Sequence, residues 1–538
     1  MSIQDLTRVQ LSFYSQSVNF QLVHLEMQCN VLEYFENGAL VLAPEKGAII
    51  DEGIIYTFSE IAFHAKNYAA LILSHVDVLN TPIAVFLPKS AQTVFADLGI
   101  VYSGNCYANL DVKSPPERLK VILINLGAAL IITSNQFAPT LLAIGVPAQQ
   151  LLIVEQSISE IAKWDEAVLR KRREYIIDTD PLCIIHTSGS TGIPKGVALS
   201  HRSTIDFMDW AFEGLELDGG AVIGSLSPFY FDIYTFELYL SLAKAATFVI
   251  IPEQLASFPI RLLEFLAEKS VSLIFWVPTI MVNIANQDLL GKITLSAMRK
   301  VLFAGEVFPT KYLNYWRRHL TKTMFVNLYG PIEVTVDCTY FIVDRDMADD
   351  EKLPIGFPCR NSDVLIINAE GRLADLEEHG ELCVRGTSLA LGYWNNPERT
   401  AQSFVQNPLQ SHYPEVIYRT GDTVYRNLRG EIMFVGRKDY QIKHLGYRIE
   451  LGEIEHACLQ IIGIKQACIV YIEEAKEIVL YFESDHNITA SKIRRELLTT
   501  LPKYMLPTIC ERVEHMPMNP NGKIDRMFLL SGRAPNAA

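Results

Sequence analysis

Residues 184–201, "IIHTSGSTGIPKGVALSH", gather anion-binding groups into one short stretch. An apolar run is followed by residues that are nearly all small, hydroxylated or glycine, with Lys195 near the end. Glycine lets backbone N–H groups point at a ligand, while hydroxyls and a lysine add donors and charge. The stretch predicts a phosphate-binding loop at the end of a buried strand, with an ordinary turn as the alternative. It is not the loop of P-loop NTPases, because Lys195 is preceded by Pro194 and followed by Gly196.

Other groups suited to nucleotide chemistry stand in turn-rich stretches further along. "NLYGPIEVT" (327–335) places Tyr329 before a Gly-Pro turn and Glu333 after it, and "YRTGD" (418–422) ends in Asp422. A carboxylate near a phosphate loop suits Mg²⁺, and Asp422 offers two acceptors for ribose hydroxyls. "NPNGKIDR" (519–526) places Lys523 in a tight turn. Taken singly, these residues could equally be a packing aromatic, turn carboxylates and a solvated lysine.

The elements that must position these groups alternate between strands and helices. Apolar runs predict strands at 81–88, 128–134, 151–156 and 271–278, and leucines at helical spacing predict a helix over 260–269. This rhythm predicts an α/β fold with mainly parallel sheets, in which ligands collect beyond the carboxyl ends of the strands.

The amino-acid composition changes near residue 440, where the stretch "GRKDYQIKHLGYRIELGEIE" (436–455) is charged and turn-rich. We expect a large N-terminal domain over 1–437, a hinge at 438–439, and a small mobile α+β C-terminal domain over 440–538 that carries Lys523.

Composition excludes several classes of function. Lys and Arg number 47 against 61 Asp and Glu, so the net charge of −14 argues against nucleic-acid and anionic-membrane partners. The nine cysteines form no CxxC pair, which predicts reduced thiols in place of a zinc site or disulfide framework. There is no signal-peptide pattern and no run of about 20 apolar residues, so we expect a soluble, cytoplasmic protein.

In this order, the motifs resemble those of the adenylate-forming superfamily. Within it, they are similar to the stand-alone amino-acid adenylation enzymes of nonribosomal peptide synthesis. The resemblance covers nearly the whole chain and includes "AGE" (304–306), "GELCVRG" (380–386) and "LPKYMLP" (501–507). Ile332 stands where the family usually has threonine, and His186 where it has tyrosine. Neither departure removes a charged group.

The resemblance implies an ATP site and a set of catalytic residues. The ATP-binding residues would be Thr187, Ser188, Gly189, Ser190, Thr191, Gly192, Lys195, Gly305, Asn327, Tyr329, Gly330, Asp422 and Arg437. Glu333 would help bind Mg²⁺, and Lys523 would bridge the substrate carboxylate and the α-phosphate, so Lys523, Lys195 and Glu333 are the implied catalytic residues. Rotation at Asp439 would then exchange Lys523 for a second face near Lys443 and Gly446, where a thiol attacks the acyl-adenylate.

Asp232, in "FDIYTFELY" (231–239), separates amino-acid activation from other members of the superfamily. An aspartate there would bind the substrate's α-ammonium, whereas a fatty-acid pocket gains nothing from a buried carboxylate. A helix N-cap is the alternative reading. The other implied pocket residues are Ile233, Phe236, Phe275, Leu302, Ala304, Leu328, Val336 and Asp337, closed by Lys523.

This mostly apolar set resembles the pocket of prolyl ligases that pass proline to a separate carrier protein, so L-proline is the favoured substrate. Asp337 departs from that pattern and would suit ornithine or arginine, so a basic amino acid stays open. An acyl- or aryl-CoA ligase and a noncatalytic scaffold are further alternatives. No carrier motif follows Lys523 and no HHxxxDG motif precedes the domain, so we expect a phosphopantetheinylated carrier protein to act in trans.

Overall fold

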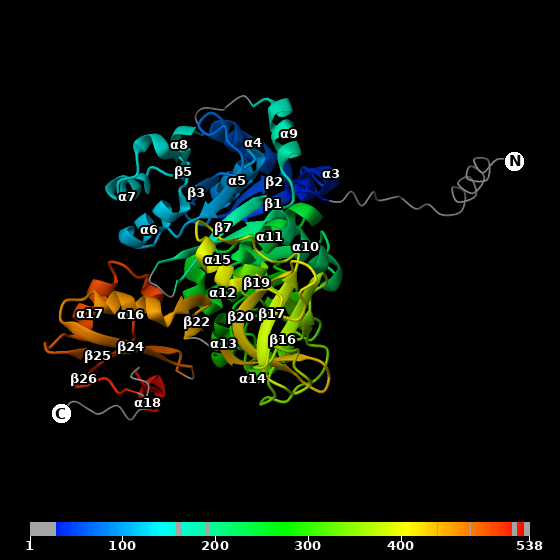
Figure 1. The fold of residues 1–538 in the computed structure, drawn as a ribbon. Coiled ribbons are helices and arrows are strands. Elements are labelled where there is room, and N and C mark those ends of the chain that lie inside the picture. Colours follow the sequence, from blue (N-terminus) through cyan, green and yellow to red (C-terminus); the bar gives the residue numbers. More distant parts are fainter. Residues whose placement is uncertain are drawn as a thin grey trace.

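The molecule consists of a large sheet-rich N-terminal domain and a smaller C-terminal domain (Figure 1). The computed structural model describes residues 28–157, 164–189, 193–437, 440–473, 475–518 and 524–531. The predicted α/β fold class is confirmed. Within the described residues, no helix is both long enough and apolar enough to cross a membrane.

A seven-stranded sheet carries the phosphate loop. Its strands, in spatial order, are β18 (Gly392–Tyr393), β8 (Lys195–Ser200), β7 (Pro181–Thr187), β4 (Cys106–Asn109), β3 (Pro82–Phe86), β5 (Leu130–Thr133) and β6 (Leu151–Ile153). Strands β7, β4, β3, β5 and β6 are parallel, whereas β8 and β18 are antiparallel to their neighbours. Every residue of β3 is buried, as expected for a parallel strand covered on both faces. The strand predicted over 151–156 ends at Ile153, and a short helix follows.

A nine-stranded sheet carries the turns predicted to bind a nucleotide. Its spatial order is β15 (Phe357–Pro358), β14 (Thr339–Ile342), β13 (Met324–Tyr329), β12 (Lys300–Phe303), β11 (Leu273–Trp276), β9 (Val222–Ser225), β10 (Thr247–Ile250), β1 (Gly47–Asp51) and β2 (Ile54–Thr57). The run from β13 to β1 is parallel, and β14, β15 and β2 are antiparallel edges. The carboxyl ends of β12 and β13 lead into Gly305 and Gly330, so the parallel strands deliver the predicted turns to one edge.

Helices pack on and between these sheets. They are α4 (Phe58–Leu73), α5 (Ala91–Tyr102), α6 (Pro116–Leu126), α7 (Ala138–Ala143), α8 (Val154–Ser157), α9 (Glu166–Tyr175), α10 (His201–Gly214), α11 (Asp232–Lys244), α12 (Pro259–Glu268), α13 (Pro278–Asn286), α14 (Thr310–His319) and α15 (Pro397–Ser403). Shorter elements are α2 (Leu32–Tyr34), η1 (Phe35–Ala39), α3 (Leu40–Leu42), η2 (Ala148–Gln150), η3 (Glu253–Ser257) and η4 (Ile332–Val334). The start of α4 is fixed by a capping box, in which Thr57 and Glu60 satisfy each other's backbone N–H groups.

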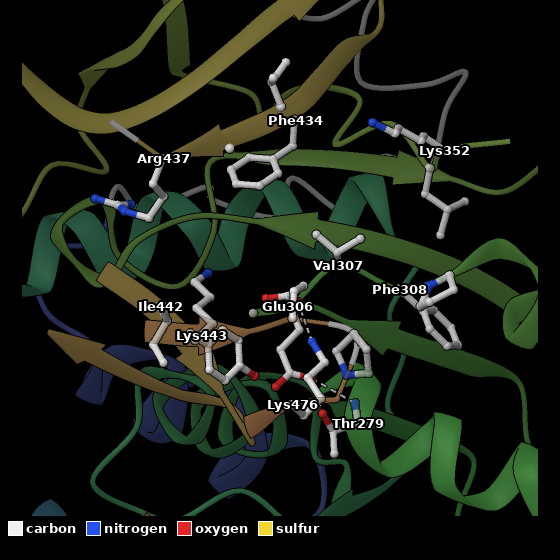
Figure 2. Close-up of a pocket in the computed structure, with 18 of the residues that line it drawn as sticks. Thr279, Glu306, Val307, Phe308, Lys352, Phe434, Arg437, Ile442, Lys443 and Lys476 are labelled. Carbon is white, nitrogen blue, oxygen red and sulfur yellow. Dashed lines mark hydrogen bonds and ion pairs between the residues drawn. The ribbon is translucent and has the colours of Figure 1, made fainter. Parts of the chain in front are cut away.

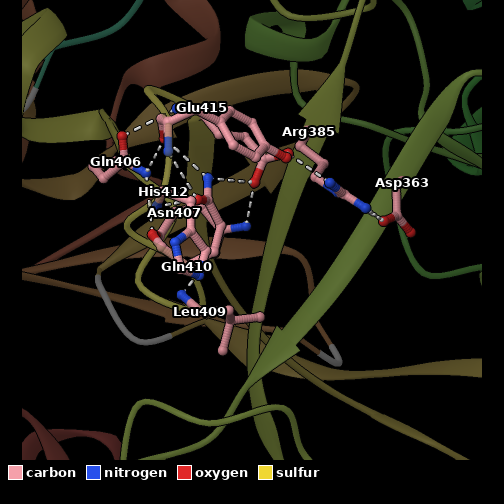
Figure 3. A network of polar contacts seen from close by, with 9 residues as sticks. Asp363, Arg385, Gln406, Asn407, Leu409, Gln410, His412 and Glu415 are labelled. Carbon is pink, nitrogen blue, oxygen red and sulfur yellow. Dashed lines mark hydrogen bonds and ion pairs between the residues drawn. The ribbon is translucent and has the colours of Figure 1, made fainter.

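A third sheet is antiparallel, which the expectation of mainly parallel sheets did not include. It contains β16 (Ser362–Ile367), β17 (Gly380–Gly386), β20 (Val416–Arg426), β19 (Phe404–Gln406) and β21 (Ile432–Arg437). A polar network braces its outer end: Arg385 donates to Asp363 at 2.8 Å and to Glu415 at 2.5 Å, and Asn407 donates to Glu415 at 2.7 Å (Figure 3). The long strand β20 delivers Asp422 to the site.

The small domain has its own hydrophobic core. It contains the hairpin β22 (Gln441–His444) and β23 (Tyr447–Glu450), helix α16 (Leu451–Leu459), the sheet of β24 (Ile464–Ile472), β25 (Glu477–Ser484) and β26 (Ile509–Val513), and α17 (Ala490–Leu497), η5 (Lys503–Met505) and α18 (Arg526–Leu530). Ile454, Ile469, Leu480 and Ile493 are fully buried between these elements. The predicted hinge, 438–439, lies outside the described residues, between β21 and β22.

Candidate active site

Two adjoining cavities lie where the sheets and the small domain meet. The larger has a volume of about 1410 Å³ and lies between the domains, and the smaller has a volume of about 170 Å³. Asp422, Arg437 and Lys443 line both cavities, so the two are neighbours. Figure 2 shows the larger cavity, with Arg437 and Phe434 on one side and Ile442 and Lys443 facing them.

The predicted phosphate loop follows the carboxyl end of β7 and leads into β8. Thr187 and Ser188 line the smaller cavity. Gly189 is required, because a Cβ there would lie 1.9 Å from the Ile193 carbonyl oxygen. Lys195, the first residue of β8, is 8% exposed, and burial lowers the pKa of its ammonium to about 8. Ser190, Thr191 and Gly192 lie outside the described residues.

The residues predicted to bind adenosine line the larger cavity. Asn327 and Tyr329 lie at the end of β13, and the Asn327 side chain donates to the Pro354 carbonyl at 2.7 Å. The Tyr329 hydroxyl donates to Asp422, and Arg437 donates to the other oxygen of that carboxylate at 2.6 Å. Gly305 lines both cavities and Gly330 the smaller one. The structure thus brings together groups from β12, β13, β20 and β21.

Glu333, in η4, is fully buried and surrounded by donors. Its carboxylate accepts from the Tyr393 hydroxyl at 2.8 Å and from Arg448 at 2.6 Å, and the Lys195 ammonium lies 3.6 Å away. Burial opposes ionisation, but the charges of Arg448 and Lys195 outweigh it and hold the pKa of Glu333 below its usual range. Glu333 is therefore an ionised carboxylate beside the phosphate loop.

The Glu333 carboxylate would bind Mg²⁺ only together with phosphate oxygens of a bound nucleotide. Within the described residues, no group of three or more His, Cys, Asp or Glu side chains is placed to hold a metal. One carboxylate together with substrate phosphates is, however, a common way for proteins to bind Mg²⁺. Glu333 would hold the ion once Arg448 had moved away.

The predicted amino-acid pocket contains two carboxylates. Asp232 is the first residue of α11, and the N-cap is Phe231, so the N-cap alternative does not hold. Burial raises the pKa of Asp232 to about 6. Asp337 is 3% exposed and lines the same small cavity, and burial followed by the nearby Asp232 charge raises its pKa well above the usual range. The pocket thus favours a cation beside Asp232 and a neutral acid at Asp337.

The predicted lining residues separate into a wall and a layer behind it. Ile233, Ala304 and Val336 line the smaller cavity, and Leu328 lines the larger one. Phe236, Phe275 and Leu302 line neither and are at most 1% exposed. Phe236 packs edge-to-face against Phe207 and Phe275, with ring centroids 5.7 and 5.8 Å apart. These side chains form a buried apolar layer behind the pocket wall.

The hairpin β22–β23 of the small domain covers the site. Lys443 and Gly446 both line the smaller cavity, and the Lys443 ammonium lies 5.9 Å from the centre of the Tyr329 ring. The Gly446 N–H donates to Glu306 at 2.9 Å. Gly446 has a φ of +81°, and a Cβ there would lie 2.7 Å from Val277, so only glycine fits this close approach. Lys523 and Asp439 lie outside the described residues.

Four charged groups were not singled out from the sequence. Arg448 neutralises Glu333, Glu450 lies 3.8 Å from Lys195, and Arg118 of α6 pairs with Glu453 of α16. Arg448, Glu450 and Glu453 belong to the stretch 436–455, whose charge density was a usable signal. Their partners could not be named, because these contacts join residues more than 100 positions apart.

Comparison with known proteins now adds to this geometry. The profile described as AMP-binding enzyme matches residues 39–394. The chain belongs to the AMP-binding enzyme family. This AMP-binding enzyme is 31% identical to Gramicidin S synthase 2 of Brevibacillus brevis over an alignment of 542 positions, which covers 98% of this chain and 12% of that protein. It is 29% identical over 512 residues to the D-alanine–D-alanyl carrier protein ligase of Bacillus cytotoxicus, covering 93% of this chain and 99% of the ligase.

Solved structures agree on the fold. The Vibrio cholerae adenylation domain AlmE, in complex with glycyl-adenosine-5'-phosphate, superposes with a TM-score of 0.81 at 21% identity, covering 96% of this chain and 99% of that one. The predicted membership of the adenylate-forming superfamily is confirmed by the match to the AMP-binding enzyme profile. The chain spans only 12% of the length of Gramicidin S synthase 2 but nearly all of the D-alanyl carrier protein ligase.

Proposed function

We propose that the enzyme uses ATP and Mg²⁺ to convert an amino acid, L-proline in the first place, to aminoacyl-AMP and pyrophosphate. It then transfers the aminoacyl group to the phosphopantetheine thiol of a separate carrier protein. The observation that supports this most strongly is the position of Asp232. Asp232 lines the smaller cavity, which adjoins the one lined by Asn327, Tyr329 and Asp422. An ammonium group and a nucleotide can therefore be held side by side.

The first step is attack of the substrate carboxylate on the α-phosphorus, with cleavage of the bond from that phosphorus to the bridging oxygen of pyrophosphate. Repulsion between the two anions is its main obstacle. Lys195 and the loop N–H groups offset the charge of the leaving pyrophosphate, and Lys523 would stand between carboxylate and α-phosphate. Asp422 orients the ribose, and Asp232 anchors the amino acid. Glu333 would hold Mg²⁺ together with the phosphates, and the ion would supply further positive charge.

The lining of the pocket favours proline over a long basic side chain. Phe236, Phe275 and Leu302 fill the space behind Ile233 and Val336, so an apolar layer closes this side of the pocket. Burial and Asp232 raise the pKa of Asp337, so Asp337 can stay protonated beside an uncharged ring. Ornithine or arginine is the rival substrate, because an ionised Asp337 would pair with its side chain.

The second step is attack of the carrier thiol on the carbonyl carbon, with loss of the thiol proton and departure of AMP. The hairpin that carries Lys443 and Gly446 lies at the site, as the resemblance implies for the thioester-forming arrangement. The similarity to a D-alanyl carrier protein ligase supports a carrier as the acceptor.

The direct test is ATP–pyrophosphate exchange with each proteinogenic amino acid and ornithine, with and without Mg²⁺. We expect exchange that needs Mg²⁺ and is strongest with L-proline. Lys523→Ala should lower it by roughly 10²–10³, the scale for removing one preorganised charge-stabilising group. Exchange with ornithine or arginine alone would replace proline, and exchange with only a fatty or aryl acid would favour the CoA-ligase alternative.

A further inference from the structure

The phosphate loop already holds a carboxylate from the small domain. The backbone N–H of Gly189 donates to one oxygen of Glu453 at 3.2 Å, and Arg118 forms an ion pair with the other oxygen. Glu453 lies on α16 and Arg118 on α6, so this carboxylate joins the two domains. The side chains of Glu453 and Arg118 are only 1% and 8% exposed.

Two further donors of the loop, Ser188 and Lys195, are also engaged by the small domain. The Ser188 hydroxyl donates to the Arg448 carbonyl at 2.6 Å and accepts from the Glu450 N–H at 3.1 Å. The Lys195 ammonium lies 3.8 Å from the Glu450 carboxylate. Two glutamates and a carbonyl therefore occupy the groups that ATP phosphates would need.

The Glu453 cradle has the chemistry of an anion site. A guanidinium and a backbone N–H that converge on one anion form charge-assisted hydrogen bonds, and arginine binds phosphate in the same geometry as carboxylate. Arg118 also lines the smaller cavity with His186, both of whose ring nitrogens are buried without a hydrogen-bond partner among the described residues. If Glu453 leaves, a nearly buried guanidinium loses its counter-ion, which is costly unless another anion replaces it.

We propose that Arg118 and the Gly189 N–H form a polyphosphate subsite, and that Glu453 occupies this subsite when the small domain is docked as observed. Arg118 then binds the β,γ-phosphates of ATP in the adenylating arrangement. The triphosphate and Glu453 exclude each other, so each anion displaces the other. The inference rests on the proposed use of ATP by this loop and adds to it a binding residue and a competitor within the chain.

Equilibrium binding of three probes tests the subsite: AMP, inorganic pyrophosphate, and the non-hydrolysable ATP analogue with a methylene bridge between the α- and β-phosphorus. Arg118→Gln should weaken binding of the analogue and of pyrophosphate by roughly 10- to 100-fold, the range for a hydrogen bond to a charged group. It should leave AMP binding unchanged, because AMP lacks the outer phosphates. Arg202→Gln, at an exposed ion pair with Asp178, is the matched control and should change nothing.

Glu453→Gln should act in the opposite direction. Without the competing charge, the analogue and pyrophosphate should bind several-fold more tightly, since a larger fraction of molecules has an open subsite. The double variant should bind them as weakly as Arg118→Gln does. Because the two single variants are expected to shift affinity in opposite senses, a general loss of folding cannot produce the pattern.

The outcomes separate this inference from the proposed function. If the wild type binds neither AMP nor the analogue, the proposed function fails. If the wild type binds both, but Arg118→Gln weakens AMP as much as the analogue, Arg118 is not a polyphosphate ligand. Unchanged or weaker analogue binding by Glu453→Gln would show that Glu453 does not compete, and would overturn the exclusion.

Discussion

At the scale of single residues, Asp232 should decide both substrate recognition and pH dependence. Its pKa is raised by burial to about 6, and only the ionised form pairs with an ammonium. We therefore expect kcat/KM for the amino acid to fall as the pH drops below about 6, because this parameter reports the free enzyme. A pH profile of exchange measures the effect, and an acid limb that survives in Asp232→Asn would assign it to another group.

Asp232→Ala should nearly abolish exchange. The substrate cation would be left desolvated and unpaired, at a cost of about 3–5 kcal/mol if the pair is buried. Asp218→Asn, at an exposed loop position, serves as the control and should keep normal activity. Normal exchange by Asp232→Ala would mean that the ammonium binds elsewhere.

Asp337 offers a contrast within the same pocket. With proline as substrate, Asp337→Val should keep exchange within a few-fold and should not lower the melting temperature, because an apolar residue of similar size often replaces a buried charge without loss of stability. With ornithine or arginine, the same change should abolish exchange. Assays of Asp232→Ala and Asp337→Val with L-proline, L-ornithine and L-arginine distinguish these cases.

At the scale of elements, local patterns were predictable and long-range pairings were not. The turn at 327–335 and helix α12 were found from the sequence, because spacing and turn chemistry act over a few residues. The antiparallel third sheet was missed, since the pairing of its strands depends on contacts between residues 14 to 44 positions apart. The Arg448–Glu333 pair spans 115 positions and was equally hidden.

The hairpin β22–β23 yields a prediction of its own. Gly446→Ala places a Cβ 2.7 Å from Val277 at a φ of +81°. The left-handed conformation alone costs an L-residue about 1–2 kcal/mol, so thioester formation should fall roughly tenfold while adenylation stays within a few-fold. Single-turnover assays of the two half-reactions measure the difference.

Gly430→Ala is the matched control, because Gly430 has a φ of +78° but no atom within 4 Å of the added Cβ. An alanine at this position has the strain of a left-handed backbone but makes no close contact through its Cβ. Equal losses in both half-reactions for Gly446→Ala would show that the hairpin is needed for folding and not specifically for the thioester step.

At the scale of the whole molecule, two buried acids should make stability depend on pH. Burial raises the pKa of Asp97 to about 7 and that of Glu237 to about 8. A folded-state pKa above the unfolded value contributes stability that is complete below about pH 4 and is lost as the pH rises through the folded pKa. For Asp97 the loss is on the order of 4 kcal/mol.

Urea unfolding between pH 5 and 9 measures this dependence. We expect the free energy of unfolding to fall toward high pH, and Asp97→Asn or Glu237→Gln to flatten the profile. Asp363→Asn, at a partly exposed ion pair in the third sheet, should leave the slope unchanged. A wild-type profile that is flat up to pH 9 would mean that both acids are ionised without penalty.

The closed layer behind the pocket has a consequence for how specificity can evolve. In the proposed function, Phe236 would limit the length of the substrate side chain, and it is also a core residue packed against Phe207 and Phe275. Truncating a buried phenylalanine to alanine costs about 3–5 kcal/mol, much of the stability of a typical domain. A lineage that widens its substrate range here must therefore first acquire stabilising substitutions elsewhere. Homologues with small residues at this position are expected to carry such compensation in the surrounding core.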